Sequence, residues 1–191
     1  DWGTAYYTSF RETAIALGST FKYEDRAAGG NRYESKDFQR FIEDPEVNVI
    51  VISLADVTGW GELFQQAKDA GKIVILSNRH RHIDELDDLY ATSVGSDFVE
   101  EGRKAGAAMC KLLESSEMKN VWELVGNEDS PAAKDRGVGF RETAEKCGIV
   151  VANSLTANWN ATEGKQITEG WLKGSNDVQG IFAQNDDMGL G

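Results

Sequence analysis

The sequence predicts an α/β protein built from parallel β-sheets in two lobes. Short β-branched runs, Val47–Ile52 and Ile73–Leu76 among them, are typical of strands that helices cover on both faces. Amphipathic segments of roughly 10 to 15 residues separate these runs, which is the spacing of parallel β-α-β units. The alternation occurs again after Ser96, so we expect two similar lobes, residues 1–95 and 96–191.

In the first half, we expect an opening helix up to Leu17, because apolar residues recur there at helical spacing and Gly18 follows as a terminator. The residues on that helical face are Tyr6, Phe10, Ala14 and Leu17. The other expected elements are a strand at Ser19–Glu24, a helix carrying Phe38, Phe41 and Ile42, the strand Val47–Ile52, a helix at Thr58–Ala70 with Trp60, Leu63 and Ala67 inward, and the strands Ile73–Leu76 and Leu89–Val94.

In the second half, two helix starts are well marked. Asp97 and Glu100 form a capping-box pattern, and Ser130 precedes a proline at the first position of a helix that runs to about Cys147. The inner face of the helix after Asp97 is expected to be Phe98, Gly102, Ala105, Met109 and Leu112. The other expected elements are the strands Val121–Val125, Ile149–Ser154 and Val178–Ala183 and a helix at Thr162–Leu172.

Both ends of the chain interrupt this pattern. The chain starts on a helix without a strand or a signal peptide before it, and it stops at Asp187–Gly191, which looks like the first turn of another helix. A parallel sheet without its leading strand would expose an edge that natural proteins pair or cover. We therefore expect a fragment, with the first strand and the C-terminal part of the second lobe absent.

Composition excludes several classes. Asp and Glu number 32 against 20 Lys and Arg, a net charge of −12, so the average field repels nucleic acid. The share of apolar residues is 40%, as in a globular chain, and apolar runs such as Val49–Ile52 are far shorter than the roughly 18 to 20 residues of a membrane span. Cys110 and Cys147 allow one disulfide without requiring it and lie in no metal-binding spacing, and we expect two half-buried thiols in helices.

Polar residues follow the ends of several predicted strands, where parallel sheets bind ligands. They are Ser53, Asn78 and Arg79, the loop from Gly126 to Ser130, the loop from Ala157 to Asn160, and Asn185 to Asp187. Planar amide, guanidinium and carboxylate groups hydrogen-bond vicinal hydroxyls, and Trp159 can stack on the C–H face of a ring. This mixture predicts a polyhydroxylated ligand, although each position taken alone is more typical of a solvated loop.

Other chemistry has little support. His80, His82 and Asp84 could ligate a metal, but no third histidine or cysteine accompanies them, so we expect no metal site. We also expect no cofactor, because the sequence has no phosphate-binding glycine loop. No nucleophile and base stand in evident partnership, so an enzyme on an α/β scaffold, such as a sugar isomerase or hydrolase, is a weaker alternative.

Five segments together resemble the sugar-binding proteins of bacterial ABC transporters, with the type I periplasmic binding protein fold, in the ribose and galactofuranose branch. These segments are Val57–Trp60, Asp69–Val74, Ser96–Gly102, Asp135–Phe140 and Phe182–Met188. The resemblance implies a monomeric, two-lobed clamp in the periplasm or at the cell surface. It would close on one monosaccharide, a pentose or hexose and possibly a furanose, and deliver it to a permease. The alternative with the same fold is the effector-binding core of a sugar-responsive repressor, against which the acidity argues.

The resemblance also implies which residues contact the sugar. Trp2 matches the aromatic beside the sugar on the first lobe, and Trp159 matches the stacking aromatic on the second. Arg79 and Arg136 match the arginines that grip ring hydroxyls, and Asn185 matches the amide that hydrogen-bonds the sugar. The alternative for each arginine is an ordinary surface ion pair, and for each tryptophan a surface or helix-covering aromatic.

The chain departs from that family pattern at two positions. Asn78 replaces the usual aspartate, which exchanges a charged acceptor for an amide that both donates and accepts. Gly3 stands where galactofuranose-type proteins tend to have an arginine, which weakens that particular assignment. Ser53 and Asp135 are weaker candidates for the same site.

Overall fold

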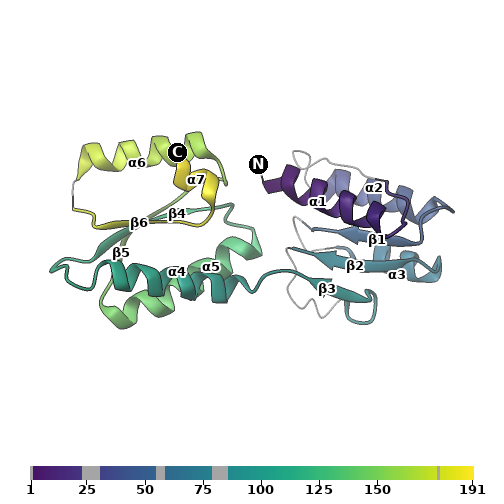
Figure 1. Ribbon diagram of the computed structural model, residues 1–191, viewed down its shortest axis with the longest axis horizontal. Coiled ribbons are helices and arrows are strands. Elements are labelled where there is room, and N and C mark those ends of the chain that lie inside the picture. The colour runs from purple at the N-terminus through teal and green to yellow at the C-terminus, as the bar shows by residue number, and fades with distance from the viewer. Residues whose placement is uncertain (1, 23–30, 55–58, 79–85, 176) are drawn as a thin grey trace.

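The computed structural model describes residues 2–22, 31–54, 59–78, 86–175 and 177–191, which form two α/β lobes (Figure 1). The first lobe contains α1 (Trp2–Ala16), α2 (Asn31–Glu43), β1 (Val49–Ile52), α3 (Gly61–Asp69), β2 (Ile73–Ser77) and β3 (Thr92–Val94). The second contains α4 (Phe98–Leu112), β4 (Asn120–Val125), α5 (Pro131–Ala144), the 3-10 helix η3 (Glu145–Cys147), β5 (Val150–Thr156), α6 (Ala161–Gly174), β6 (Gly180–Ala183) and α7 (Asp186–Leu190). Each lobe has its own parallel sheet, which confirms the predicted fold class.

The first sheet has the strand order β1-β2-β3, and all its strands run parallel. Side chains of α2 and α3 form the core with one face of this sheet. There the ring of Phe38 stacks on Phe64 with centroids 5.1 Å apart, and Trp60 meets Phe38 edge-on at 5.6 Å. Trp60 is only 2% exposed, which confirms its prediction as a core residue.

One prediction for the start of the chain is confirmed and one is wrong. The opening helix is present as α1, and the hydroxyl of Tyr6 donates to Ser77 at the end of β2 at 2.6 Å, although Leu17, just beyond the helix, is 79% exposed. Residues 19–22 form no strand, and Glu24 lies outside the described residues. In the described part of the sheet β1 pairs only with β2, so residues 19–22 have no strand partner there.

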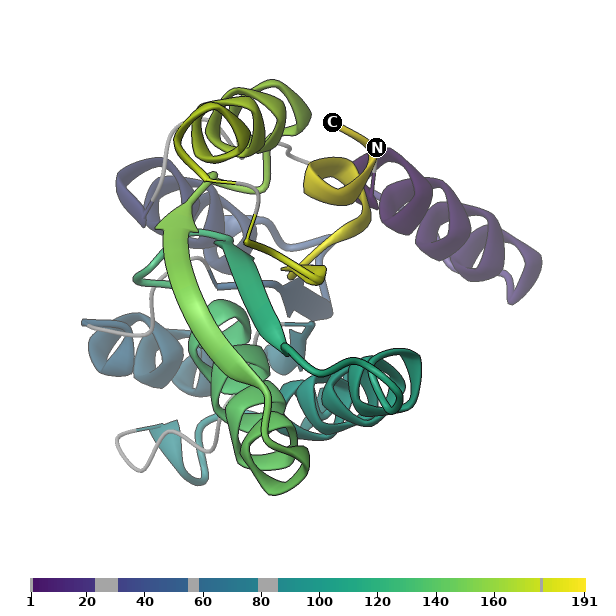
Figure 2. The same ribbon diagram turned by 90° about the vertical axis from the view of Figure 1, so that its left-hand side faces the viewer.

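The second sheet has the order β5-β4-β6, with β4 in the centre. The views in Figures 1 and 2 agree that α4 and α5 cover one face of it and α6 the other. On the first face Phe140 stacks on Phe182 with centroids 4.1 Å apart, and on the other Trp122 meets Trp171 at 5.1 Å. The strand predicted at Val121–Val125 is therefore the buried centre of the lobe.

Helices α4 and α5 approach each other so closely that their backbones touch. A Cβ atom on Gly139 would lie 1.9 Å from the carbonyl oxygen of Val99, and one on Gly102 would lie 2.1 Å from that of Arg136. Only glycine fits at these two positions unless the helices separate. Arg136, one of the predicted site residues, lies at this contact.

Gly139→Ala is expected to lower the free energy of unfolding by about 1–3 kcal/mol, because the added methyl group forces the packed helices apart. Urea unfolding followed by circular dichroism measures the change. Gly170→Ala on α6 is the matched control, since nothing lies within 4 Å of its added Cβ. The control substitution should leave the free energy of unfolding unchanged or raise it by up to about 1 kcal/mol. A Gly139→Ala variant as stable as the control would contradict the close packing of α4 on α5.

The predicted helix starts are confirmed, whereas one predicted core residue is wrong. Asp97 caps α4, with its carboxylate accepting from the backbone N–H of Glu100 at 2.9 Å, and α5 begins at Pro131. Leu112 is 76% exposed, however, and Leu113 is buried instead. Leu113 lies four residues after the buried Met109, and its N–H donates to the carbonyl of Met109 at 3.0 Å, so the helical spacing places Leu113 and not Leu112 on the inner face.

Cys110 and Cys147 form a disulfide, which corrects the expectation of two free thiols. Their Cα atoms are 5.9 Å apart, and the bond joins α4 to η3.

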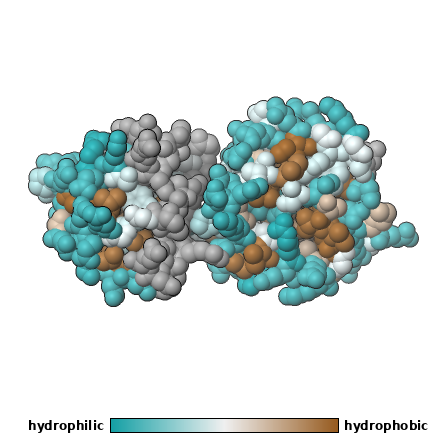
Figure 3. Space-filling model, turned by 180° about the vertical axis from the view of Figure 1, so that it is seen from behind, coloured by the Kyte–Doolittle hydropathy of each residue, from teal (hydrophilic) through white to brown (hydrophobic). Residues whose placement is uncertain are grey.

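The surface drawn in Figure 3 is mostly hydrophilic, with apolar residues in separate patches, as the net charge of −12 leads one to expect. Within the described ranges, no helix has the length and apolar character that a membrane span requires.

Candidate functional site

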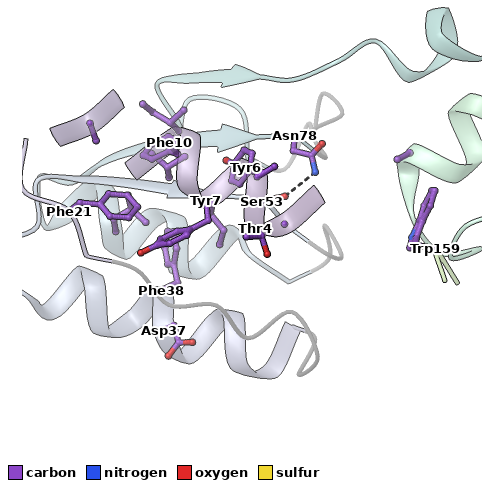
Figure 4. Close-up of a pocket in the computed structure, with 18 of the residues that line it drawn as sticks. Thr4, Tyr6, Tyr7, Phe10, Phe21, Asp37, Phe38, Ser53, Asn78 and Trp159 are labelled. Carbon is purple, nitrogen blue, oxygen red and sulfur yellow. Dashed lines mark hydrogen bonds between the residues drawn. The ribbon is translucent and has the colours of Figure 1, made fainter. Parts of the chain in front are cut away.

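A pocket of about 1710 Å³ opens between the two lobes and continues beneath α1 along β1. Figure 4 shows Ser53 and Asn78 on the first-lobe side of the opening and Trp159 facing it from the second lobe. Five of the predicted site residues line this one pocket: Ser53, Asn78, Arg136, Trp159 and Asn185. The carboxyl ends of strands from both sheets therefore contribute to the same cleft.

Asn78 and Ser53 form a polar pair at the ends of β2 and β1. The side-chain amide of Asn78 donates to the hydroxyl of Ser53 at 3.5 Å, drawn as a dashed line in Figure 4. Asn78 has a φ of 66°, and its backbone N–H donates to the carbonyl of Val94 at 2.8 Å. Asparagine tolerates this left-handed conformation better than most residues, which suits it to end the strand and turn its amide toward the cleft.

Arg136 projects from α5 on the second-lobe side and is held by three neighbours. Its Nε donates to Glu101 at 2.8 Å, and its guanidinium lies 4.7 Å from the ring centroid of Phe98 and 5.8 Å from that of Trp159. Neither Nη1 nor Nη2 has a hydrogen-bond partner among the described residues. The planar group is thus fixed in orientation while its terminal N–H donors stay available to a ligand.

Trp159 lies in a strained turn after β5. Asn158 and Trp159 have φ values of 48° and 62°, a conformation that asparagine tolerates but that costs a residue such as tryptophan about 1–2 kcal/mol. The turn is closed by a bond from the N–H of Asn160 to the carbonyl of Ala157 at 2.8 Å. Strain of this kind persists where surrounding contacts impose it, often at ligand sites. Here the half-buried indole lies directly against Gly126.

Asn185 already makes two hydrogen bonds with its side chain. Its Oδ1 caps α7 by accepting from the N–H of Met188 at 3.1 Å, and its Nδ2 donates to the carbonyl of Trp159 at 3.4 Å. One amide hydrogen and one lone pair remain for a ligand. Asp135 is 7% exposed within α5, and unlike its neighbour Arg136 it is not among the described residues that line the pocket.

The far end of the pocket, beneath α1, carries a charged group. Lys22 forms ion pairs with Asp44 at 2.6 Å and Glu46 at 2.8 Å. Hydrogen bonds to these carboxylates raise the pKa of Lys22, and the bond from Lys22 lowers the pKa of Asp44. Exposed pairs of this kind contribute little to stability.

Several sequence predictions fall on residues of which the structure gives no account. Arg79 and the group of His80, His82 and Asp84 lie outside the described residues. Trp2 begins α1, but its side chain is not described. Within the described ranges, no group of three or more histidine, cysteine or acidic residues could hold a metal ion.

Sequence reasoning missed several residues that shape the cleft. Phe98 and Glu101 line it beside Arg136, although the sequence suggested only a core position for Phe98 and no role for Glu101. Gln184 was missed as well, although it holds the backbone of Gly126, a residue of the predicted strand-end loop that supports the indole of Trp159. The only available signal was position: Gln184 follows directly after a predicted strand.

Comparison with known proteins supplies the family. The periplasmic binding protein domain family matches residues 1–191, which is the whole chain. The chain belongs to this family. The galactofuranose-binding protein of Escherichia coli is 31% identical over 100% of the chain, and the fructose import binding protein of Bifidobacterium longum is 29% identical over 91% of it. The chain covers 60% and 53% of these two relatives, so it spans little more than half of their length.

Two solved structures have the same fold as this chain. A protein from Mycobacterium smegmatis in complex with β-D-fucofuranose is 35% identical with a TM-score of 0.88, over 99% of this chain and 62% of that one. The binding protein of an arabinose ABC transporter from a Shewanella species, bound to α- and β-L-arabinofuranose, is 30% identical with a TM-score of 0.91, over 100% and 62%. The proteins from Escherichia coli, Bifidobacterium longum and Shewanella are described as binding proteins.

Proposed function

We propose that this chain belongs to a solute-binding protein that captures a monosaccharide between its lobes and delivers it to an ABC permease. One observation carries the proposal: Arg136, whose Nη groups have no hydrogen-bond partner within the described ranges, lines the same cleft as the indole of Trp159 and the Ser53–Asn78 pair. Guanidinium and amide groups hydrogen-bond sugar hydroxyls, while an aromatic ring covers the C–H face. The arrangement requires no covalent chemistry, so we propose a binding protein and not an enzyme.

The proposed ligand is a pentose or hexose in its furanose form. Two similar proteins, 35% and 30% identical to this chain, were solved with fucofuranose and arabinofuranose bound. Trp2, Arg79 and Asp135 are proposed as further contacts on the basis of the family pattern. Asn78 brings an amide in place of the family's aspartate, so we expect the hydroxyl read at this position to act as donor or acceptor.

Binding is proposed to close the cleft by a hinge movement of two lobes, residues 1–95 and 96–191. The connection between β3 and α4, near Ser96, is the part of the hinge within this chain. Such a carrier works as a monomer and needs no nucleic-acid partner. The net charge of −12 agrees with the absence of a nucleic-acid partner, because it repels the phosphate backbone.

The proposed location is the periplasm or the cell surface. The family is named for periplasmic proteins, and the disulfide between Cys110 and Cys147 supports an oxidising compartment.

Calorimetric titration with L-arabinose, D-galactose, D-ribose and D-fructose tests the proposal. It is run on this chain and on the longest natural form of the protein, since the chain spans about 60% of one relative's length. At least one sugar is expected to bind the long form with a Kd of about 1 μM or below, which corresponds to about −8 kcal/mol. Succinate, which has no ring, is the negative control. No saturable heat with any sugar would contradict the function.

A further inference from the structure

A buried network of hydrogen bonds lies directly beneath the second-lobe side of the cleft. Glu123 on β4 has 0% of its surface exposed, and its carboxylate accepts from Arg141, from Ser154 at 2.8 Å and from Gln184 at 2.9 Å. A buried carboxylate needs such partners, since burial without them would be very costly. The network therefore joins β4, α5, β5 and the end of β6 at one point.

Glu123 determines which way the amide of Gln184 faces. The Nε2 group of Gln184 donates to Glu123 and, at 3.1 Å, to the carbonyl oxygen of Ala133. Both partners can only accept, so the amide nitrogen has to point toward them. The Oε1 atom consequently points the other way, where it accepts from the backbone N–H of Gly126 at 3.0 Å.

Gly126 in turn supports Trp159. A Cβ atom on Gly126 would lie 2.1 Å from Cζ2 of the indole, so the ring rests on the bare backbone at that position. The place of Gly126 therefore sets how far Trp159 reaches into the cleft. Gln184 also directly precedes Asn185, whose side chain donates to the carbonyl of Trp159 at 3.4 Å.

We propose that Gln184, oriented by the buried carboxylate of Glu123, is a positioning residue that holds Trp159 in place through Gly126. Neither Gln184 nor Glu123 contacts the sugar in this scheme. Both act on the ligand only through the position of the indole and of Asn185. The consequence for sugar affinity rests on the proposed function, but the effect on Trp159 does not and is measured without any ligand.

Fluorine NMR of the chain labelled with 5-fluorotryptophan tests the proposal. The five tryptophans give separate signals, and Trp159→Phe identifies the one that belongs to Trp159. Gln184→Glu keeps the side-chain length but replaces the amide donor with a second carboxylate facing Glu123. The Trp159 signal is expected to shift and broaden in this variant, while the signals of Trp60 and Trp171 stay in place.

Ser154→Ala is the matched control. It removes a bond to the same Glu123 carboxylate, but from β5 and without contact to Gln184. The Trp159 signal of the Ser154→Ala variant should stay at the wild-type position, even if this variant is less stable than the wild-type protein. A Trp159 signal that is unchanged in Gln184→Glu, or that shifts equally in Ser154→Ala, would overturn the positioning role.

Two further measurements keep the proposal open to refutation. In the wild-type protein, the backbone amide of Gly126 should exchange its hydrogen with solvent more slowly than the amides of Asn127 and Glu128. Equally fast exchange would overturn the proposal, even if Gln184→Glu fails to fold.

In titrations with L-arabinose and D-galactose, Gln184→Glu should raise the Kd about tenfold, the loss expected for one misplaced ring contact. Unchanged affinity despite a shifted Trp159 signal would refute the link to binding. A wild-type protein that binds no sugar would defeat the proposed function alone.

Discussion

Arg136→Ala is expected to abolish sugar binding while the second lobe stays folded. The two Nη groups of Arg136 have no hydrogen-bond partner among the described residues, so each can donate to a ligand hydroxyl. A hydrogen bond to a charged group contributes about 1.5–3 kcal/mol, and two such bonds correspond to a rise in Kd of roughly 100-fold or more. Calorimetry with the sugar that binds best measures this change.

Arg103→Ala is the control for that experiment. Arg103 is an exposed arginine on α4, and it pairs with Glu142 at 3.0 Å and with Glu100 at 3.7 Å. It is not among the described residues that line the pocket, so its loss should leave the sugar Kd unchanged. Circular dichroism establishes that both variants are folded. Sugar binding by Arg136→Ala at wild-type strength would mean that the family pattern misplaces this contact.

The parts of the fold that sequence predicted correctly are those governed by local chemistry. β-branched runs at Val49–Ile52 and Ile73–Ser77 became strands, and a proline after Ser130 marked the start of α5. The prediction of a strand from Ser19 onward is wrong because the alternation of apolar and polar side chains cannot show whether a partner strand lies beside the segment.

The site was predictable to the extent that topology alone places it. Residues after parallel strands meet at one edge, and this rule located Ser53, Asn78 and Asn185. This rule could not predict which residues at the ends of different strands contact one another. Gly126 supports the ring of Trp159, from another part of the chain, only because β4 and β5 are neighbours.

Pairing of the cysteines was unpredictable for a related reason. Cys110 and Cys147 are separated by 37 residues, a spacing that says nothing about distance in space. The pair forms because the glycines of α4 and α5 let these helices touch, which brings the end of α4 close to η3. The disulfide is thus a consequence of helix packing that neither cysteine reveals in the sequence.

Removing that disulfide with Cys110→Ser and Cys147→Ser together is expected to lower the free energy of unfolding by about 2–4 kcal/mol. A bond that closes a loop of this length restricts the unfolded chain, and the loss of that restriction favours unfolding. Urea unfolding under non-reducing conditions measures the difference between the variant and the wild-type protein. Equal urea midpoints for the double variant and the wild-type protein would contradict a stabilising role for the disulfide.

A reductant provides the control, because it should destabilise the wild-type protein and leave the double variant unchanged. Sugar affinity should be the same in both proteins below the unfolding transition. Phe98, at the first residue of α4, lines the cleft, whereas Cys110 lies three turns further along the same helix. Since α4 stays packed on α5 through Gly102 and Gly139 near its cleft end, losing the bond should loosen the far end of the helix without moving Arg136.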